Sequence, residues 1–147
     1  MSTEQMDGKS GSRHLGRSIG ALLAGFVVGT ILSLGTDIGL HGIGLFPALG
    51  TPIFSSGLLL LATTYRSIYG VISSYVTARL APDRPLQHAL VGGAVGVVLN
   101  IAGIAATWNR GLGPHWYPLM LLTLTMPIAW IGGMLREKQL RPEIAVH

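Results

Sequence analysis

Residues 51–78, TPIFSSGLLLLATTYRSIYGVISSYVTA, decide the fold class, because this long and mostly apolar stretch holds a single charged residue, Arg66. The hydrocarbon core of a bilayer requires about 20 predominantly apolar residues from a helix. Three further apolar stretches of similar length lie at residues 18–36, 88–107 and 117–135. The sequence therefore predicts an all-α, polytopic membrane protein whose four transmembrane helices form an up-down bundle, with the second span at about 58–78.

The composition supports one membrane domain with little else. Only 11% of the 147 residues are charged and 49% are hydrophobic, whereas a soluble domain carries about 25% charged residues. The four spans occupy most of residues 18–135, which leaves a polar segment at 1–17, expected to be disordered, and a short tail at 136–147. The absence of cysteine excludes disulfides, thiolate metal sites and iron–sulfur clusters.

The placement of the basic residues predicts the orientation in the membrane. Of the Lys and Arg residues outside the spans, only Arg110 lies between the third and fourth spans. The other eight lie in the two tails and in the turn after the second span: Lys9, Arg13, Arg17, Arg79, Arg84, Arg136, Lys138 and Arg141. By the positive-inside rule both termini are cytoplasmic. This placement disfavours nucleic-acid binding, and it disfavours the small transporters that insert in both orientations and have balanced loops.

Small residues at intervals of four predict which helix faces pack against protein. Gly25 and Gly29 share one face of the first span, and Gly92 and Gly96 share one face of the third. Such residues let helix backbones approach closely in lipid, within one chain or between two copies. In the fourth span Pro127 predicts a kink that frees the carbonyl of Thr123, four residues earlier.

Helix counting places four polar groups in the outer half of the predicted bundle. At 1.5 Å per residue Arg66 lies about 12 Å below the outer membrane edge. Asn100 and Thr123 lie at a similar depth, and Asp37 lies at the edge itself. Three interpretations stay open: a polar lock that fixes helix packing, a site for an anion, headgroup or solute, and an arginine that snorkels to lipid phosphate.

No catalytic, metal or cofactor constellation is evident in the sequence. Asp37, His41 and His115 form an incomplete ligand set for zinc, and no histidine lies at mid-span to ligate a haem. Ser73 and Ser74 have no histidine at their depth that could activate a nucleophile. We therefore expect no enzyme activity, no cofactor and no metal.

Several strings resemble a group of uncharacterised small four-helix bacterial integral membrane proteins. They are SLGTD, ATTYRSIYG, SSYVTARLAPDRPLQHAL, GPHWYP and MPIAWIGGML. The resemblance covers roughly residues 18–135, and it implies four spans in the bacterial cytoplasmic (inner) membrane. It implies no assigned activity and no site residues.

The expected function is that of a structural or accessory component of that membrane. Its partners would then be the lipid bilayer and either further copies of the chain or a larger membrane protein. The alternative is a small transporter or channel in which Arg66 binds an anion or headgroup near the outer face. The apolar segment 37–57 either lies on the membrane surface or dips into it as a cap.

Overall fold

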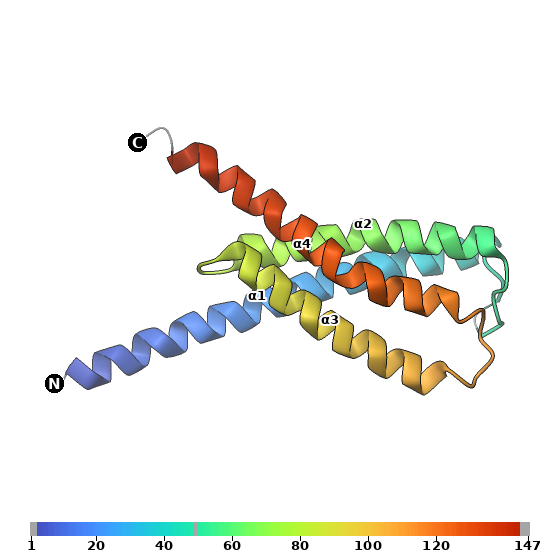
Figure 1. Ribbon diagram of the computed structural model, residues 1–147, viewed down its shortest axis with the longest axis horizontal. Coiled ribbons are helices and arrows are strands. Elements are labelled where there is room, and N and C mark those ends of the chain that lie inside the picture. The colour runs from blue at the N-terminus through green and yellow to red at the C-terminus, as the bar shows by residue number, and fades with distance from the viewer. Residues whose placement is uncertain (1–2, 49, 145–147) are drawn as a thin grey trace.

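The computed structural model describes residues 3–48 and 50–144, and in them the chain forms four helices without a strand. The helices are α1 (Thr3–Gly42), α2 (Ser56–Leu80), α3 (Pro85–Thr107) and α4 (Trp116–Ile144). Successive helices run in opposite directions (Figure 1). One end, called here the terminal end, carries the N-terminal part of α1, the C-terminal part of α4 and the α2–α3 turn. The opposite connection end carries residues 43–48, 50–55 and 108–115. The all-α prediction is confirmed for the described residues.

Three of the four helices are long and apolar enough to cross a membrane, which indicates a membrane protein. The qualifying segments are Arg13–Gly42, Pro85–Thr107 and Trp116–Arg141. They contain the predicted first, third and fourth spans. α2 is long enough, but Arg66 and a series of Ser and Thr residues make it less apolar than these three segments.

Both ends of the chain are more helical than the sequence predicts. Residues 1–17 are expected to be disordered, yet α1 begins at Thr3, and residues 1–2 lie outside the described part. α4 likewise continues through the expected tail as far as Ile144, with residues 145–147 outside the description. The physical reason is cooperativity: each residue added to an existing helix gains a hydrogen bond without a new nucleation step.

Packing centres on α2, which contacts all three other helices. α3 also packs along α4, whereas α1 meets α3 only briefly, and the described residues of α1 and α4 make no contact. The bundle is therefore asymmetric. α1 packs mainly against α2, and its contact with α3 is the smallest among the helix pairs that touch.

The predicted glycine faces pack against helices of the same chain. A Cβ on Gly25 would lie 2.7 Å from the carbonyl oxygen of Ser73 on α2, and one on Gly29 would lie 3.1 Å from the Cβ of Ser73. On α3, a Cβ on Gly96 would lie 3.1 Å from Cγ2 of Thr125 in α4. Gly92 is less crowded, with Cδ2 of Leu22 at 3.4 Å. These glycines thus permit the close helix approach that the spacing predicts.

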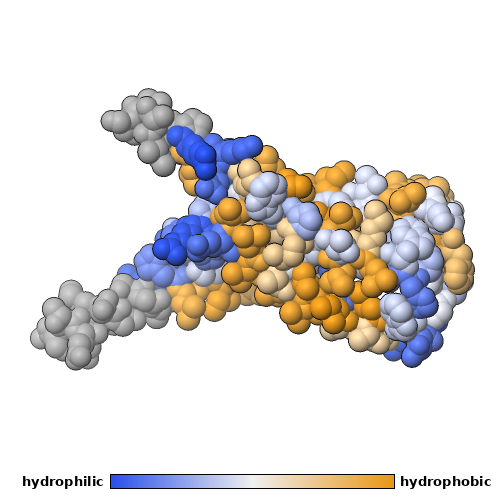
Figure 2. All heavy atoms as spheres, viewed as in Figure 1, coloured by the Kyte–Doolittle hydropathy of each residue, from blue (hydrophilic) through white to orange (hydrophobic). Residues whose placement is uncertain are grey.

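Lipid-facing surface surrounds the middle of the bundle. The side chains of Ile31, Ile38 and Val98 are each about two-thirds exposed. Figure 2 shows hydrophobic residues over the central part of the molecule, with hydrophilic residues gathered toward the two ends. An apolar belt of this kind suits the hydrocarbon region of a bilayer.

Candidate functional site

The most polar contact inside the bundle is an ion pair between α1 and α2. Nη2 of Arg66 donates to Oδ2 of Asp37 at 2.6 Å. The hydroxyl of Tyr65 donates to the other carboxylate oxygen, Oδ1. Both oxygens of Asp37 are therefore bonded by neighbouring residues of α2, and its side chain is only 19% exposed.

Further hydrogen bonds follow the same α1–α2 seam. The hydroxyls of Thr36 and Tyr69 lie 2.8 Å apart, and Oγ of Ser73 donates to the carbonyl oxygen of Gly25 at 2.6 Å. Tyr65, Tyr69 and Ser73 recur at intervals of four on α2, which puts them on one face of that helix. In lipid, where apolar burial cannot drive association, such bonds and close packing hold helices together.

The structure does not join Asn100 to Arg66. The amide of Asn100 donates to Oγ1 of Thr125 on α4 at 3.1 Å and to the Gly96 carbonyl at 3.0 Å. It thereby forms a second polar contact, between α3 and α4. Thr125 is absent from the expected set because α4 is apolar along most of its length, so its sequence does not show which side faces the bundle.

Thr123 lies on the outside of α4, where its hydroxyl donates to the carbonyl of Leu119 at 2.9 Å. It and Thr125 are two residues apart, so they point in nearly opposite directions at about 100° per residue. α4 continues as helix through Pro127. In the described residues no side chain donates to the Thr123 carbonyl. Of the polar groups expected at the depth of Arg66, the structure therefore joins Asp37 to the arginine, and it does not join Thr123.

Arg66 keeps most of its hydrogen-bonding capacity free. A guanidinium has five N–H donors, and in the described part of the chain only the bond to Asp37 is formed. Nε is buried without a partner, while the side chain as a whole is 37% exposed. The pair with Asp37 is thus electrically neutral, with a hydrogen bond on each carboxylate oxygen and N–H donors left on the guanidinium.

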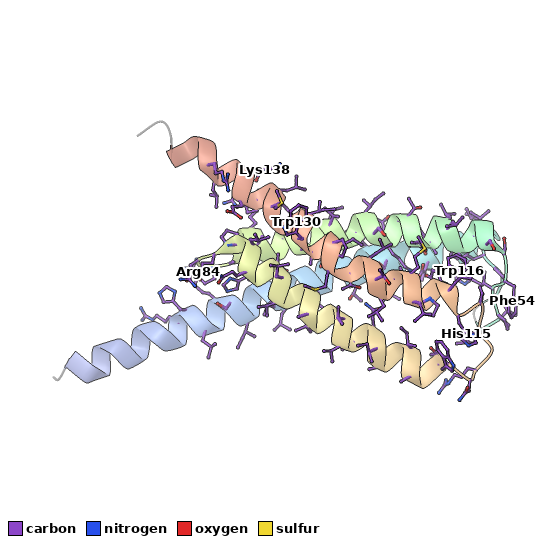
Figure 3. All side chains as sticks on the ribbon, viewed as in Figure 1. Phe54, Arg84, His115, Trp116, Trp130 and Lys138 are labelled. Carbon is purple, nitrogen blue, oxygen red and sulfur yellow. The ribbon has the colours of Figure 1, made fainter. Side chains whose placement is uncertain are left out.

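A cavity of about 400 Å³ lies at the connection end, and Arg66 is on its wall. Tyr65 and Tyr117 also line it, as do Trp108 and His115, which stack with ring centroids 4.1 Å apart. Figure 3 shows Phe54, His115 and Trp116 together at this end of the molecule. The volume is within the range of about 300–1,000 Å³ typical of small-molecule sites. We call this space the connection-end cavity.

A second cavity, of about 560 Å³, extends from Arg66 toward the terminal end and is called here the core cavity. All four helices line it, and its wall is mainly apolar, with Leu22, Leu99 and Ile128 among the lining residues. Arg66 lines both cavities. The arginine therefore sits at the junction between two mainly apolar spaces, of which the connection-end one also has aromatic and imidazole side chains.

The residues considered for a metal site are otherwise engaged. Nδ1 of His41 lies 2.6 Å from the carbonyl oxygen of Asp37, and His115 stacks on Trp108. Over residues 3–48 and 50–144, no group of three or more His, Cys, Asp or Glu side chains could hold a metal ion.

The Asn100 contact makes a testable contribution to stability. In the Asn100→Leu variant we expect a loss of about 1 kcal/mol in the free energy of unfolding, the usual net contribution of a neutral hydrogen bond. Thermal unfolding in mild detergent measures it, with Thr107→Val as control, because the Thr107 hydroxyl is exposed and bonds only within its own helix. Equal melting temperatures for the native protein and Asn100→Leu would show that the α3–α4 contact is dispensable.

Comparisons of the chain with protein-family models, curated proteins and solved structures find no match.

Proposed function

We propose that α2 is the fourth membrane span and that the chain is a structural or accessory component of a bacterial cytoplasmic membrane. The 25 residues of α2 extend about 37 Å at 1.5 Å per residue, more than the hydrocarbon thickness of about 30 Å. Its outward-facing large side chains are apolar, with Leu60 and Ile68 about half exposed. These features support placing α2 in the bilayer beside its three partners.

The proposed orientation has both termini in the cytoplasm. Arg84 and Lys138 lie toward the terminal end, whereas Trp116 lies at the connection end (Figure 3). Basic residues favour the cytoplasmic side, and aromatic residues favour the interfaces. The terminal end is therefore proposed to face inward.

One observation carries the structural role: each carboxylate oxygen of Asp37 accepts a hydrogen bond from α2, so its pairing with Arg66 joins two helices. A polar lock is the simplest role for an intramembrane charge whose partner is an opposite charge on a neighbouring helix of the same chain. The protein would present its apolar belt to lipid, to further copies of itself or to a larger membrane protein.

The second candidate, a small transporter or channel, is supported by the two cavities that meet at Arg66. It requires movement of a solute past the ion pair. Anion flux by the purified protein in liposomes, abolished when Arg66 and Asp37 are replaced together, would favour it. Extraction as a stable homo-oligomer or stoichiometric complex, without flux, would favour the structural role.

The topology can be tested directly because the chain has no cysteine. We expect a membrane-impermeant maleimide to label the Thr51→Cys and Asn109→Cys variants in intact cells. The Asp83→Cys variant should react only after lysis. Residues 51 and 83 flank α2, so equal labelling of their variants from outside would show that α2 does not span. The reverse pattern would show that the orientation is inverted.

A further inference from the structure

α1 and α3 meet near the terminal end and separate toward the connection end. Oγ of Ser18 and Nε2 of His88 lie 2.9 Å apart, and Leu22 approaches Gly92 one turn further along. Beyond this point α3 diverges from α1 and α2 (Figure 1). The connection-end and core cavities lie along this opening, and we call the two together the α1–α3 cleft. Leu23, Phe26 and Leu99 line the core cavity and are each about half exposed, so the cleft is open at the side of the bundle that would face lipid.

Both parts of the α1–α3 cleft have mainly apolar walls, but apart from Arg66 the polar groups of the core cavity are uncharged hydroxyls and amides, whereas the connection-end cavity also has acidic and imidazole side chains. The core cavity offers apolar side chains, among them Phe26, Leu99 and Leu121. The connection-end cavity offers Arg66, Tyr117 and His115. A matching ligand has an apolar tail and a polar head, with the change between them near the depth of Arg66.

The hydrogen-bonding state of the ion pair indicates what the polar part of the ligand contains. Asp37 is paired with the positive charge of Arg66 and accepts one hydrogen bond on each carboxylate oxygen, so the site has no unpaired negative charge to attract a cation. The guanidinium of Arg66 retains N–H donors, and arginine binds phosphate oxygens through such donors. The head should therefore carry acceptor oxygens.

We propose that the α1–α3 cleft holds one phospholipid, with an acyl chain in the core cavity and its phosphate or ester oxygens at Arg66. This inference rests on the proposal that all four helices lie in the bilayer. A lipid is the occupant that fits because the cleft opens sideways rather than only to water, and its two parts match the apolar and donor-bearing walls.

Native mass spectrometry of the full chain, released from nanodiscs of a single phospholipid, tests the proposal. We expect one lipid retained per chain. The Leu99→Trp substitution fills the core cavity and should lower the retained fraction about tenfold, a cost within the range for overfilling a packed site. Val98→Trp is the matched control, since Val98 is the adjacent residue, is 65% exposed and does not line the cavity.

A second pair of variants distinguishes a loss of lipid binding from a folding defect. Leu23 lines the core cavity from α1, whereas the similarly exposed Ile19 does not. Leu23→Trp should therefore release the lipid and Ile19→Trp should not. Thermal unfolding establishes which variants are folded.

The polar end is tested with the Asp37→Asn/Arg66→Gln double variant, which removes both charges together. We expect it to retain less lipid than the native protein. Excess inorganic phosphate should leave lipid retention unchanged, and displacement by phosphate would reassign Arg66 to a free anion.

Two results would overturn the proposal. Equal retention in Leu99→Trp and Val98→Trp would identify the bound lipid as unspecific surface lipid. A dimer mass that Leu99→Trp converts to monomer would show that a second copy fills the cleft. The cysteine labelling described above is independent of lipid retention, so a wrong topology and an empty cleft are distinguishable.

Discussion

The Gly132→Ala variant will unfold at a much lower temperature than the native protein in mild detergent, or fail to fold. An alanine Cβ at this position would lie 2.7 Å from the carbonyl oxygen of Val71 and 2.8 Å from the backbone nitrogen of Tyr75. Both atoms belong to the backbone of α2, so relief requires α2 and α4 to move apart. We expect a loss of about 3 kcal/mol or more, at the upper end of the range for overpacking.

Gly35→Ala is the control for this substitution. Gly35 is also helical, but an added Cβ there meets nothing within 4 Å. Alanine has a higher helix propensity than glycine by about 1 kcal/mol, so Gly35→Ala should be neutral or stabilising. Equal losses at residues 35 and 132 would show that flexibility of the helices, rather than the α2–α4 approach, determines the effect.

The second large effect is expected at the ion pair. Asp37→Leu leaves Arg66 charged without its carboxylate, and Arg66→Leu leaves Asp37 with only the Tyr65 hydroxyl. Removing one partner of an enclosed pair is strongly destabilising, while replacing both by apolar residues is often nearly neutral. We expect each single variant to lose about 2–4 kcal/mol in the free energy of unfolding. The Asp37→Leu/Arg66→Leu double variant should recover most of that loss.

Thermal unfolding of the four proteins forms a double-mutant cycle, which isolates the coupling between the two side chains. Tyr65→Phe is the matched control, because it removes one hydrogen bond to Asp37 without changing charge, and should lose about 1–2 kcal/mol. If Arg66→Leu melts at the native temperature or above, packing does not require the arginine. The polar-lock interpretation is then wrong, and Arg66 is retained for something that it binds.

The glycines show which helix contacts can be predicted from residue spacing and which cannot. Gly25, Gly29, Gly92 and Gly96 are recognisable because a stripe at intervals of four defines a helix face. Gly132 and Gly133 are not part of such a stripe, yet Gly132 approaches the backbone of α2 as closely as Gly25 does, with an α2 carbonyl oxygen 2.7 Å from the added Cβ in each case. Which glycine meets a neighbouring backbone depends on where two helices cross, and the crossing point belongs to the assembled bundle.

What the sequence by itself determined is the helical class and the depth of the polar residues. Apolar length predicts helices that cross a bilayer, and a constant rise per residue converts residue number into depth. Counting places Asp37 at the membrane edge and Arg66 about 12 Å deeper, and the long arginine side chain directed toward that edge brings the two into contact in the structure. The neutral pairing follows from the one acidic side chain within reach of the arginine.

Only the tertiary structure decided which way each helix faces and how closely the helices meet. A shift of one residue turns a side chain by about 100° while changing its depth by only about 1.5 Å. Thr123 and Thr125 therefore look equivalent by depth, although only Thr125 faces α3 and bonds Asn100. The α1–α3 cleft likewise arises from the divergence of two helices, and helix direction is set by packing between elements rather than by the sequence of either one.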